Sequence, residues 1–134
     1  MTHYHADSSS PSKPVFRSLG VVSTIVNKDI DWLWIDCEHG WASSVEGTGA
    51  ACVLARSRGV APVIRVAWND PALIKKALDM GAVGVMIPQV QNAAEAKAAV
   101  DAARYFPEGM RGISPVSAAP RFAIRELCWY RFTS

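Results

Sequence analysis

Hydrophobic residues in this chain follow two patterns that alternate along the sequence. Three short segments are apolar almost throughout, which is typical of strands in a parallel sheet covered on both faces. These segments are Asp31–Asp36 (DWLWID), Pro62–Ala67 (PVIRVA) and Val83–Pro88 (VGVMIP). Between and after them, apolar residues recur every three to four positions, as on one side of an amphipathic helix. We therefore expect strands that alternate with helices.

Signals for the start and the end of a helix frame the segment after the second strand. Asp70 can cap the first turn, Pro71 suits the first helical position, and Gly81 is a typical residue just beyond a helix end. We predict a helix over 70–81. Its apolar stripe is expected to consist of Leu73, Ile74, Ala77 and Leu78.

A further helix is predicted after the third strand, from Asn92 to about Tyr105. Asn92 and Glu95 have the spacing of a capping box, in which the two residues satisfy each other's backbone N–H groups. The expected apolar face consists of Ala96, Ala99, Val100 and Ala103. Its small side chains indicate that this helix packs closely against a neighbour.

The segment Ser43–Arg58, between the first two strands, has a weaker helical pattern. Gly47 and Gly49 each cost a helix up to about 1 kcal/mol relative to alanine. We therefore predict a helix only from about Ala50 to Arg58.

The alternation of strands and helices predicts an α/β fold with parallel strands joined by right-handed crossovers. A (β/α)₈ TIM barrel needs roughly 250 residues, and this chain has 134. The pattern alone leaves two architectures open: a small open α/β sheet, or about the first half of a TIM barrel.

Composition and charge narrow the classes of function. The chain has 14 basic and 12 acidic residues and no long run of Lys or Arg, which argues against a nucleic-acid-binding protein. No apolar stretch approaches the roughly 20 residues that span a membrane. No glycine-rich phosphate loop of the GxGxxG or Walker type is present, so nucleotide binding is not supported.

The two ends of the chain differ in composition from its middle. We expect a disordered polar tail over 1–14 that is not a signal peptide, a domain over 15–116 and a divergent C-terminal tail over 117–134. His3 and His5 could share a metal ion, but a solvated terminus is the favoured reading. The cysteines are odd in number and have no CxxC spacing, which favours reduced thiols in a cytoplasmic protein; they are Cys37, Cys52 and Cys128.

Polar side chains cluster where the three predicted strands end. The candidates are Asp36, Glu38 and His39 after the first strand, Arg65, Trp68 and Asn69 around the second, and Gln89 and Gln91 after the third. The carboxyl ends of parallel strands meet at one edge, where sites of α/β proteins form. A carboxylate beside an imidazole suits proton transfer near neutral pH, and an arginine offers several donors to an anion. The edge therefore suits acid–base chemistry on a small anionic substrate.

Structural roles compete with this functional interpretation. Arg65 could pair with Asp36 simply to neutralise it in a barrel-like core, and His39 could cap a helix. The tryptophans are expected to serve packing rather than stacking on bases; they are Trp32, Trp34, Trp41 and Trp68. On spacing alone, the structural and the functional roles of the arginine and the histidine stay equally open.

Four motifs in order resemble the HpcH/HpaI aldolase family, the metal-dependent 2-oxo-acid aldolases of the pyruvate-type TIM barrels. They are the D-x-E-H strand end at Asp36–His39, the R-V-x-W-N-D-P turn at Arg65–Pro71, the D-x-G-A-x-G-V-M-I-P strand at Asp79–Pro88, and the R-G pair at Arg111–Gly112. The resemblance covers about Asp31 to Pro115. It favours a partial TIM barrel over an open sheet.

The resemblance implies a carbon–carbon lyase that cleaves 4-hydroxy-2-oxo acids to a pyruvate-like 2-oxo acid and an aldehyde, or forms them in reverse. It implies that His39 is the acid–base residue, that Asp36 is the carboxylate paired with it, and that Arg65 binds the keto oxygen and the developing enolate. Glu38 and Gln89 are implied to orient the site or to hold the water shell of a divalent cation, Mg²⁺ or Mn²⁺.

The implied metal ligands, a Glu and an Asp, are expected beyond Pro115, where Glu126 is the only acidic residue, so no metal ligand is assigned in this chain. The alternative is a truncated, non-catalytic fragment, and independent catalysis by this chain is not expected. Half a barrel leaves open strand edges and exposes Val85, Ile87 and the inward side of Val63–Val66. We therefore expect marginal stability or self-association, with no membrane or nucleic-acid partner.

Overall fold

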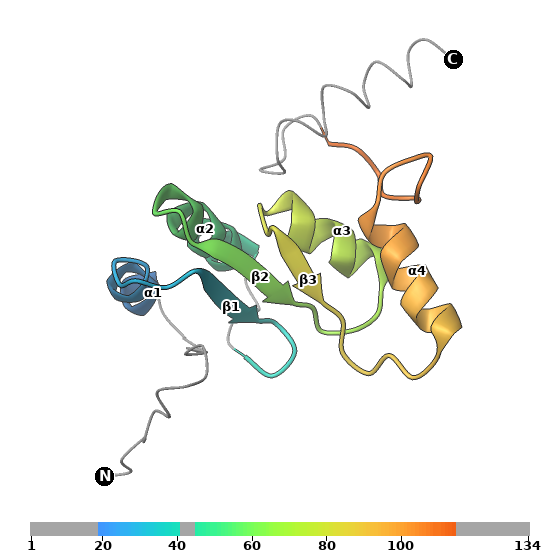
Figure 1. Cartoon of the computed structure of the whole chain (residues 1–134), viewed down its shortest axis with the longest axis horizontal. Helices are drawn as coiled ribbons and strands as arrows, with labels where there is room; N and C mark the ends of the chain where they lie inside the picture. The colour runs from blue at the N-terminus through green and yellow to red at the C-terminus, as the bar shows by residue number, and fades with distance from the viewer. Residues whose placement is uncertain (1–18, 41–44, 115–134) are drawn as a thin grey trace.

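The computed structural model describes residues 19–40 and 45–114 and shows a three-stranded parallel sheet with helices between the strands (Figure 1). The strands are β1 (Trp32–Asp36), β2 (Ala61–Arg65) and β3 (Gly84–Met86), and the helices are α1 (Leu19–Ile25), α2 (Val45–Ser57), α3 (Pro71–Asp79) and α4 (Ala93–Ala103). The predicted α/β class with parallel strands is confirmed.

The strands lie side by side in chain order, β1–β2–β3, and all run in the same direction. The register places Trp34 opposite Val63, and Asp36 opposite Arg65 at the carboxyl ends of β1 and β2. On the other side of β2, Arg65 lies opposite Met86. Residues that are far apart in the sequence therefore meet at one edge of the sheet.

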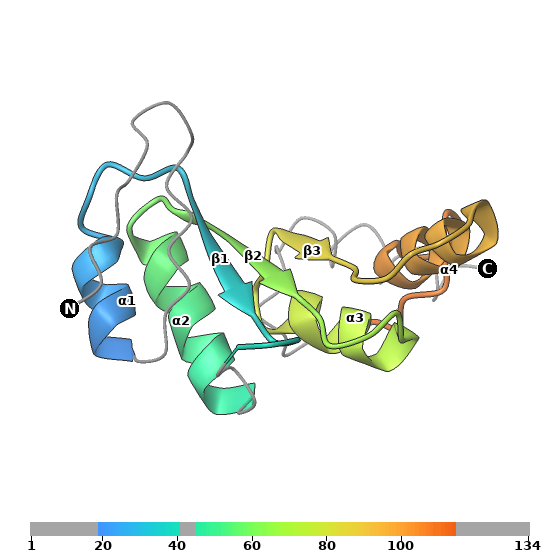
Figure 2. The ribbon, with the colours of Figure 1, turned by 90° about the horizontal axis from the view of Figure 1, so that it is seen from below.

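Helices α2 and α3 cover one face of the sheet, as the view in Figure 2 shows. Side chains alternate along a strand, so that every second residue of β1 and β2 points to this face. Leu33, Ile35, Pro62 and Ile64 are buried there. The core is completed by buried residues of the helices and their connections: Val22, Val26, Ala51, Cys52, Ala55, Val60, Val66, Ile74, Ala77, Ala82, Ala99 and Ala102.

No helix of the described residues covers the opposite face, although the apolar strand runs predict cover on both faces (Figure 2). Trp34 and Val63 are half-buried on this open face, and Met86 is 40% exposed. The expectation that Val85 and Ile87 face water is wrong, since both pack against the core. The register explains this for Val85, which lies opposite the buried Ile64 on the helix-covered face.

Helices α3 and α4 begin where their capping residues predict. The Asp70 carboxylate accepts the backbone N–H groups of Ala72 (2.9 Å) and Leu73 (3.0 Å), with Pro71 in the first turn. The Asn92 side chain accepts the Glu95 N–H at 3.0 Å. These bonds satisfy backbone donors that have no partner within the first turn of a helix.

Other details of the helices differ from the sequence pattern. Helix α2 extends through both glycines, because the burial of Thr48, Ala51, Cys52 and Ala55 outweighs their weak helix propensity. Helix α1 is not predicted by the pattern at all. In α3 and α4, the expected stripe residues Leu73 and Val100 are exposed, and Ala102 is buried in α4 instead.

Arg111, from the R-G motif, anchors the segment after α4. Its guanidinium donates to Asp79 of α3 at 2.8 Å and lies over the Tyr105 ring, 4.5 Å from the ring centroid. The motif thus has a structural role, which ties the end of the described chain to α3.

Some predictions fall outside the described residues. These are the polar tail with His3 and His5, the divergent tail with Glu126, and the residues Trp41 and Cys128. Among the described helices, none is long and apolar enough to cross a membrane.

Candidate functional site

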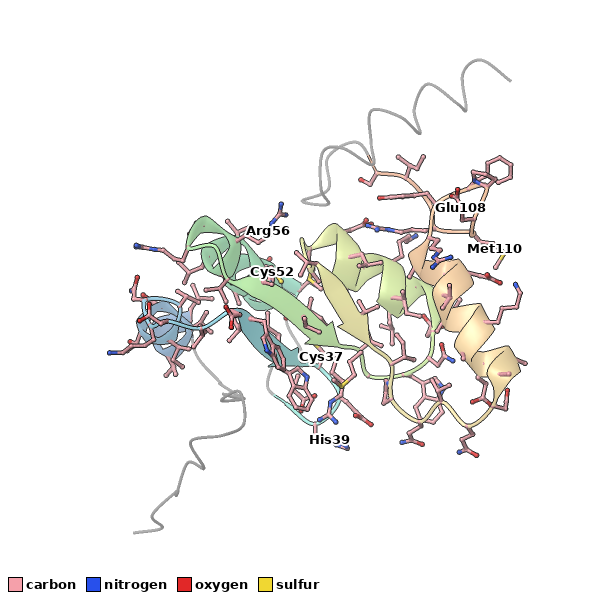
Figure 3. All side chains as sticks on the ribbon, viewed as in Figure 1. Cys37, His39, Cys52, Arg56, Glu108 and Met110 are labelled. Carbon is pink, nitrogen blue, oxygen red and sulfur yellow. The ribbon has the colours of Figure 1, made fainter. Side chains whose placement is uncertain are left out.

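The carboxyl ends of β1 and β2 bring four of the predicted site residues together. Asp36 and Arg65 are the last residues of their strands and face each other in the register. Glu38 and His39 follow in the loop after β1, and Figure 3 shows His39 beyond the end of this strand. Parallel pairing of β1 with β2 thus unites residues from two separate motifs of the sequence.

Arg65 is the centre of the cluster. Its Nε donates to Asp36 Oδ1 at 2.9 Å, its Nη2 binds Asp36 Oδ2, and its Nη1 lies 3.0 Å from Glu38 Oε2. A guanidinium has five N–H donors. These contacts with the described residues engage one donor on each nitrogen, which leaves one N–H on Nη1 and one on Nη2 for a further acceptor.

Asp36 is buried and fully engaged. Besides Arg65, it accepts the backbone N–H groups of Glu38 at 3.0 Å and His39 at 3.2 Å, both on Oδ1. The hydrogen bond from Arg65 is the largest cause that lowers the pKa of Asp36 to about 2, against the opposing effect of burial. The same bond raises the pKa of Arg65. The pair is therefore ionised at neutral pH.

The carboxylate nearest to the His39 imidazole belongs to Glu38. Glu38 Oε1 lies 3.5 Å from His39 Nε2, whereas Asp36 meets His39 only through its backbone N–H. The implied pairing of Asp36 with the imidazole is therefore not what the geometry shows. The reason is that Asp36 lies on the strand opposite Arg65, while the loop turns the Glu38 side chain toward both Arg65 and His39. The His39 side chain is 73% exposed and accessible to a substrate.

The remaining candidates at strand ends lie outside this cluster of contacts. Asn69 donates to the backbone carbonyl of Glu95 at 3.1 Å and thereby joins the loop after β2 to α4. Gln91 donates its backbone N–H to the Glu95 carboxylate at 2.9 Å, and Trp68 is exposed. Gln89 is exposed and has a left-handed backbone, with φ of 54°.

Trp34 is a member of the cluster that sequence reasoning assigns to packing alone. The Arg65 guanidinium carbon lies 5.0 Å from the centroid of the Trp34 ring, a typical distance for a cation–π contact. The signal in the sequence is that Trp34 and Asp36 are two positions apart. On a strand, this spacing places both side chains on the same face.

The described residues do not make a metal site. Among them, no group of three His, Cys, Asp or Glu residues could hold a metal ion. The two carboxylates of the cluster are already occupied by the Arg65 guanidinium.

A cavity of about 300 Å³ lies on the opposite, helix-covered side of the sheet and is separate from this cluster. It is lined mainly by apolar residues of α2, α3 and β2, with Cys37 and Thr48 in its wall. Burial raises the pKa of the Cys37 thiol, and raises that of Cys52 to about 12, so neither is a reactive thiolate at neutral pH. Both are free thiols, as predicted.

Comparison with known proteins identifies what the chain resembles. The model of the family described as HpcH/HpaI aldolase/citrate lyase matches residues 18–128. This match extends beyond both ends of the region that carries the four motifs.

Two curated relatives share close to half of their residues with the aligned part of this chain. The 2-dehydro-3,6-dideoxy-6-sulfogluconate aldolase of Pseudomonas putida is 44% identical over 94 residues, which are 69% of this chain and 36% of that protein. The 4-hydroxy-2-oxo-heptane-1,7-dioate aldolase of Salmonella dublin is 46% identical over 88 residues, which are 66% of this chain and 33% of that protein. The chain thus spans about a third of the length of these relatives.

A solved structure shares the fold. The crystal structure of the HpcH/HpaI aldolase from Desulfitobacterium hafniense matches with a TM-score of 0.69 and 27% identity. The match covers 83% of this chain and 47% of that one. The three parallel strands and their helices therefore correspond to about half of a known aldolase fold.

Proposed function

Because the chain belongs to the HpcH/HpaI aldolase/citrate lyase family, we propose that the carboxyl edge of β1 and β2 is part of an aldolase site. The reaction is the reversible cleavage of a 4-hydroxy-2-oxo acid into a pyruvate-like 2-oxo acid and an aldehyde. The observation that carries the proposal is the Arg65 guanidinium, held by two carboxylates with donors left over beside the exposed His39. The names of the relatives support the substrate class.

Arg65 binds the 2-oxo acid in this proposal. When the bond between C3 and C4 breaks, its electron pair moves toward C2, and negative charge develops on the keto oxygen. A guanidinium aimed at this oxygen stabilises the enolate more than the neutral ketone, which lowers the barrier. Asp36 and Glu38 hold the guanidinium in place.

His39 transfers the proton. In the cleavage direction it removes the proton of the C4 hydroxyl, so that the carbonyl of the aldehyde forms as the C3–C4 bond breaks, and this proton is then delivered to C3 of the enolate to give the 2-oxo acid. In the synthesis direction it returns this proton to the new hydroxyl. Glu38 orients the imidazole of His39 from 3.5 Å. In this proposal, Glu38 and Gln89 also lie beside the substrate or the water shell of the divalent cation.

A second candidate is a binding role without catalysis. It rests on the same observation, because the donors that the Arg65 guanidinium keeps can hold an anion whether or not a reaction follows. The two candidates share the same anion site but differ in turnover. In both, the chain works in the cytoplasm, where the free thiols Cys37 and Cys52 stay reduced.

Titration calorimetry with pyruvate and with oxalate, in buffer containing Mn²⁺, tests the shared site. We expect binding by the unaltered chain and none by Arg65→Ala. Lys75→Ala, which removes an exposed charge on α3, is the control and should bind as well as the unaltered chain. Equal heats for the unaltered chain and Arg65→Ala would overturn the assignment of the site.

Pyruvate release from a 4-hydroxy-2-oxo acid then separates the two candidates. If the chain is an aldolase, release is faster than in buffer and His39→Ala lowers it by about 10²-fold or more, as expected for the loss of an acid–base group. Binding without release by any of the variants would identify the non-catalytic role.

A further inference from the structure

We propose that Trp34 is a positioning residue that fixes the plane of the Arg65 guanidinium for the 2-oxo acid. The inference rests on the proposed function and adds a residue that the four motifs do not assign. Its starting point is the cation–π contact, in which the Arg65 guanidinium carbon lies 5.0 Å from the centroid of the Trp34 ring.

The core on the helix-covered face does not explain the presence of Trp34. Leu33 and Ile35, its neighbours on β1, fill that face, and Trp34 lies on the open face together with Asp36 and Arg65. Within the register, Trp34 is opposite the half-buried Val63. The large indole thus lies on the same face as the proposed site.

Hydrogen bonding of the indole does not explain its position either. The Trp34 Nε1 atom is buried and has no hydrogen-bond partner among the described residues. A buried donor without a partner costs free energy, and tryptophan usually avoids this cost by finding an acceptor. The ring face does have a charged neighbour, the Arg65 guanidinium.

Three side chains, Asp36, Glu38 and Trp34, then restrain the Arg65 guanidinium. Asp36 and Glu38 bind its nitrogens along two edges of the guanidinium and set its direction. Hydrogen bonds tolerate a bend of roughly 30° before they weaken, so these contacts still allow the guanidinium a small tilt. The face of Trp34 restricts this tilt, because a cation is most stable over the ring. The remaining N–H groups on Nη1 and Nη2 are then held in a fixed direction toward the substrate.

Two substitutions of Trp34 test the role of the ring face. Trp34→Phe keeps an aromatic face and removes the unpaired N–H, whereas Trp34→Leu keeps apolar bulk without a face. We expect Trp34→Leu to weaken oxalate binding about threefold to thirtyfold, and Trp34→Phe to stay within about threefold of the unaltered chain. Trp32→Leu is the matched control on the same strand, and it should bind oxalate like the unaltered chain.

A spectroscopic measurement checks the contact without substrate. The emission of Trp34 is obtained as the difference between the unaltered chain and Trp34→Phe. This difference should change in the Arg65→Met background, because the cation no longer lies over the ring. Circular dichroism of each variant verifies that it is folded.

The outcomes separate this inference from the function on which it rests. If the unaltered chain binds oxalate and Trp34→Leu binds equally well, the positioning role is overturned and the proposed function stands. Equal losses in Trp34→Leu and Trp34→Phe, or in Trp32→Leu, also overturn it. If the unaltered chain binds no oxalate, the proposed function and this inference fail together.

Discussion

The Asp36 carboxylate and the Arg65 guanidinium form an ion pair on the open face of the sheet. A buried carboxylate is stable as an ion only when a cation and N–H donors surround it, and Asp36 has Arg65 and two backbone N–H groups. The pair therefore serves structure and the proposed chemistry together. The two roles that sequence spacing leaves open for Arg65 do not exclude each other, because the guanidinium keeps donors for a further acceptor.

Acid should expose the structural part of this role. The pKa of Asp36 is lowered from 3.8 to about 2 in the folded chain, so its contribution to stability is complete above about pH 4 and is lost as the pH falls through about 2. The loss amounts to about 2 kcal/mol. Urea unfolding at pH 5 and pH 2 should show it in the unaltered chain. Asp36→Asn should lack this part of the pH dependence, whereas Asp31→Asn, a change of an exposed residue just before β1, should keep it.

At this scale, the sequence predicts which residues meet but not how they pair. Asp36, Glu38, His39 and Arg65 are found because strand ends of a parallel sheet share an edge. Their partners depend on the direction of each side chain, and Asp36 and Arg65 are 29 positions apart in the sequence. The pattern of residue types holds no information about that direction, so it does not show that Glu38 Oε1 lies 3.5 Å from His39 Nε2.

At the scale of elements, capping residues predict where a helix begins better than the helix propensities of its residues do. Asp70 and Asn92 mark the starts of α3 and α4 because their bonds are local and need no knowledge of the fold. Helix α2 depends on packing against the sheet, so its glycines mislead a reading of the sequence. The same holds for Val100, whose apolar character predicts burial although α4 turns it to solvent.

Two glycines around α2 should respond oppositely to alanine. A Cβ atom at Gly49 would meet Met80 Cγ at 3.9 Å, an ordinary contact, so Gly49→Ala should stabilise the chain by about 0.5–1 kcal/mol. Gly59 follows the helix with φ of 76°, where a side chain is strained, and Gly59→Ala should destabilise it by about 1 kcal/mol. Thermal unfolding monitored by circular dichroism measures both. A fall in the midpoint for Gly49→Ala would show that α2 does not tolerate a side chain there.

At the scale of the whole molecule, the described residues cover only one of the two faces of the sheet. The barrel architecture that the family match supports buries both faces, which is why the strand runs of the sequence are apolar almost throughout. The alternation of side chains along each strand then determines which residues lie on the open face. The sequence alone places Val85 on the open face, whereas the register places it on the helix-covered face. Met86, Trp34 and Val63 lie on the open face instead.

The open face of the sheet and the unpaired edge of β3 should cause the chain to self-associate. Among the described residues, β3 pairs with β2 only, and its backbone groups on the other side are available to another strand. The sedimentation coefficient of the chain should therefore rise with protein concentration. Met86→Lys, which puts a charge at this edge, should shift the rise to higher concentration. Val53→Lys, a change of a more exposed apolar residue on α2, should leave it unchanged. A coefficient that does not depend on concentration, or an equal effect of both lysines, would contradict association through this edge.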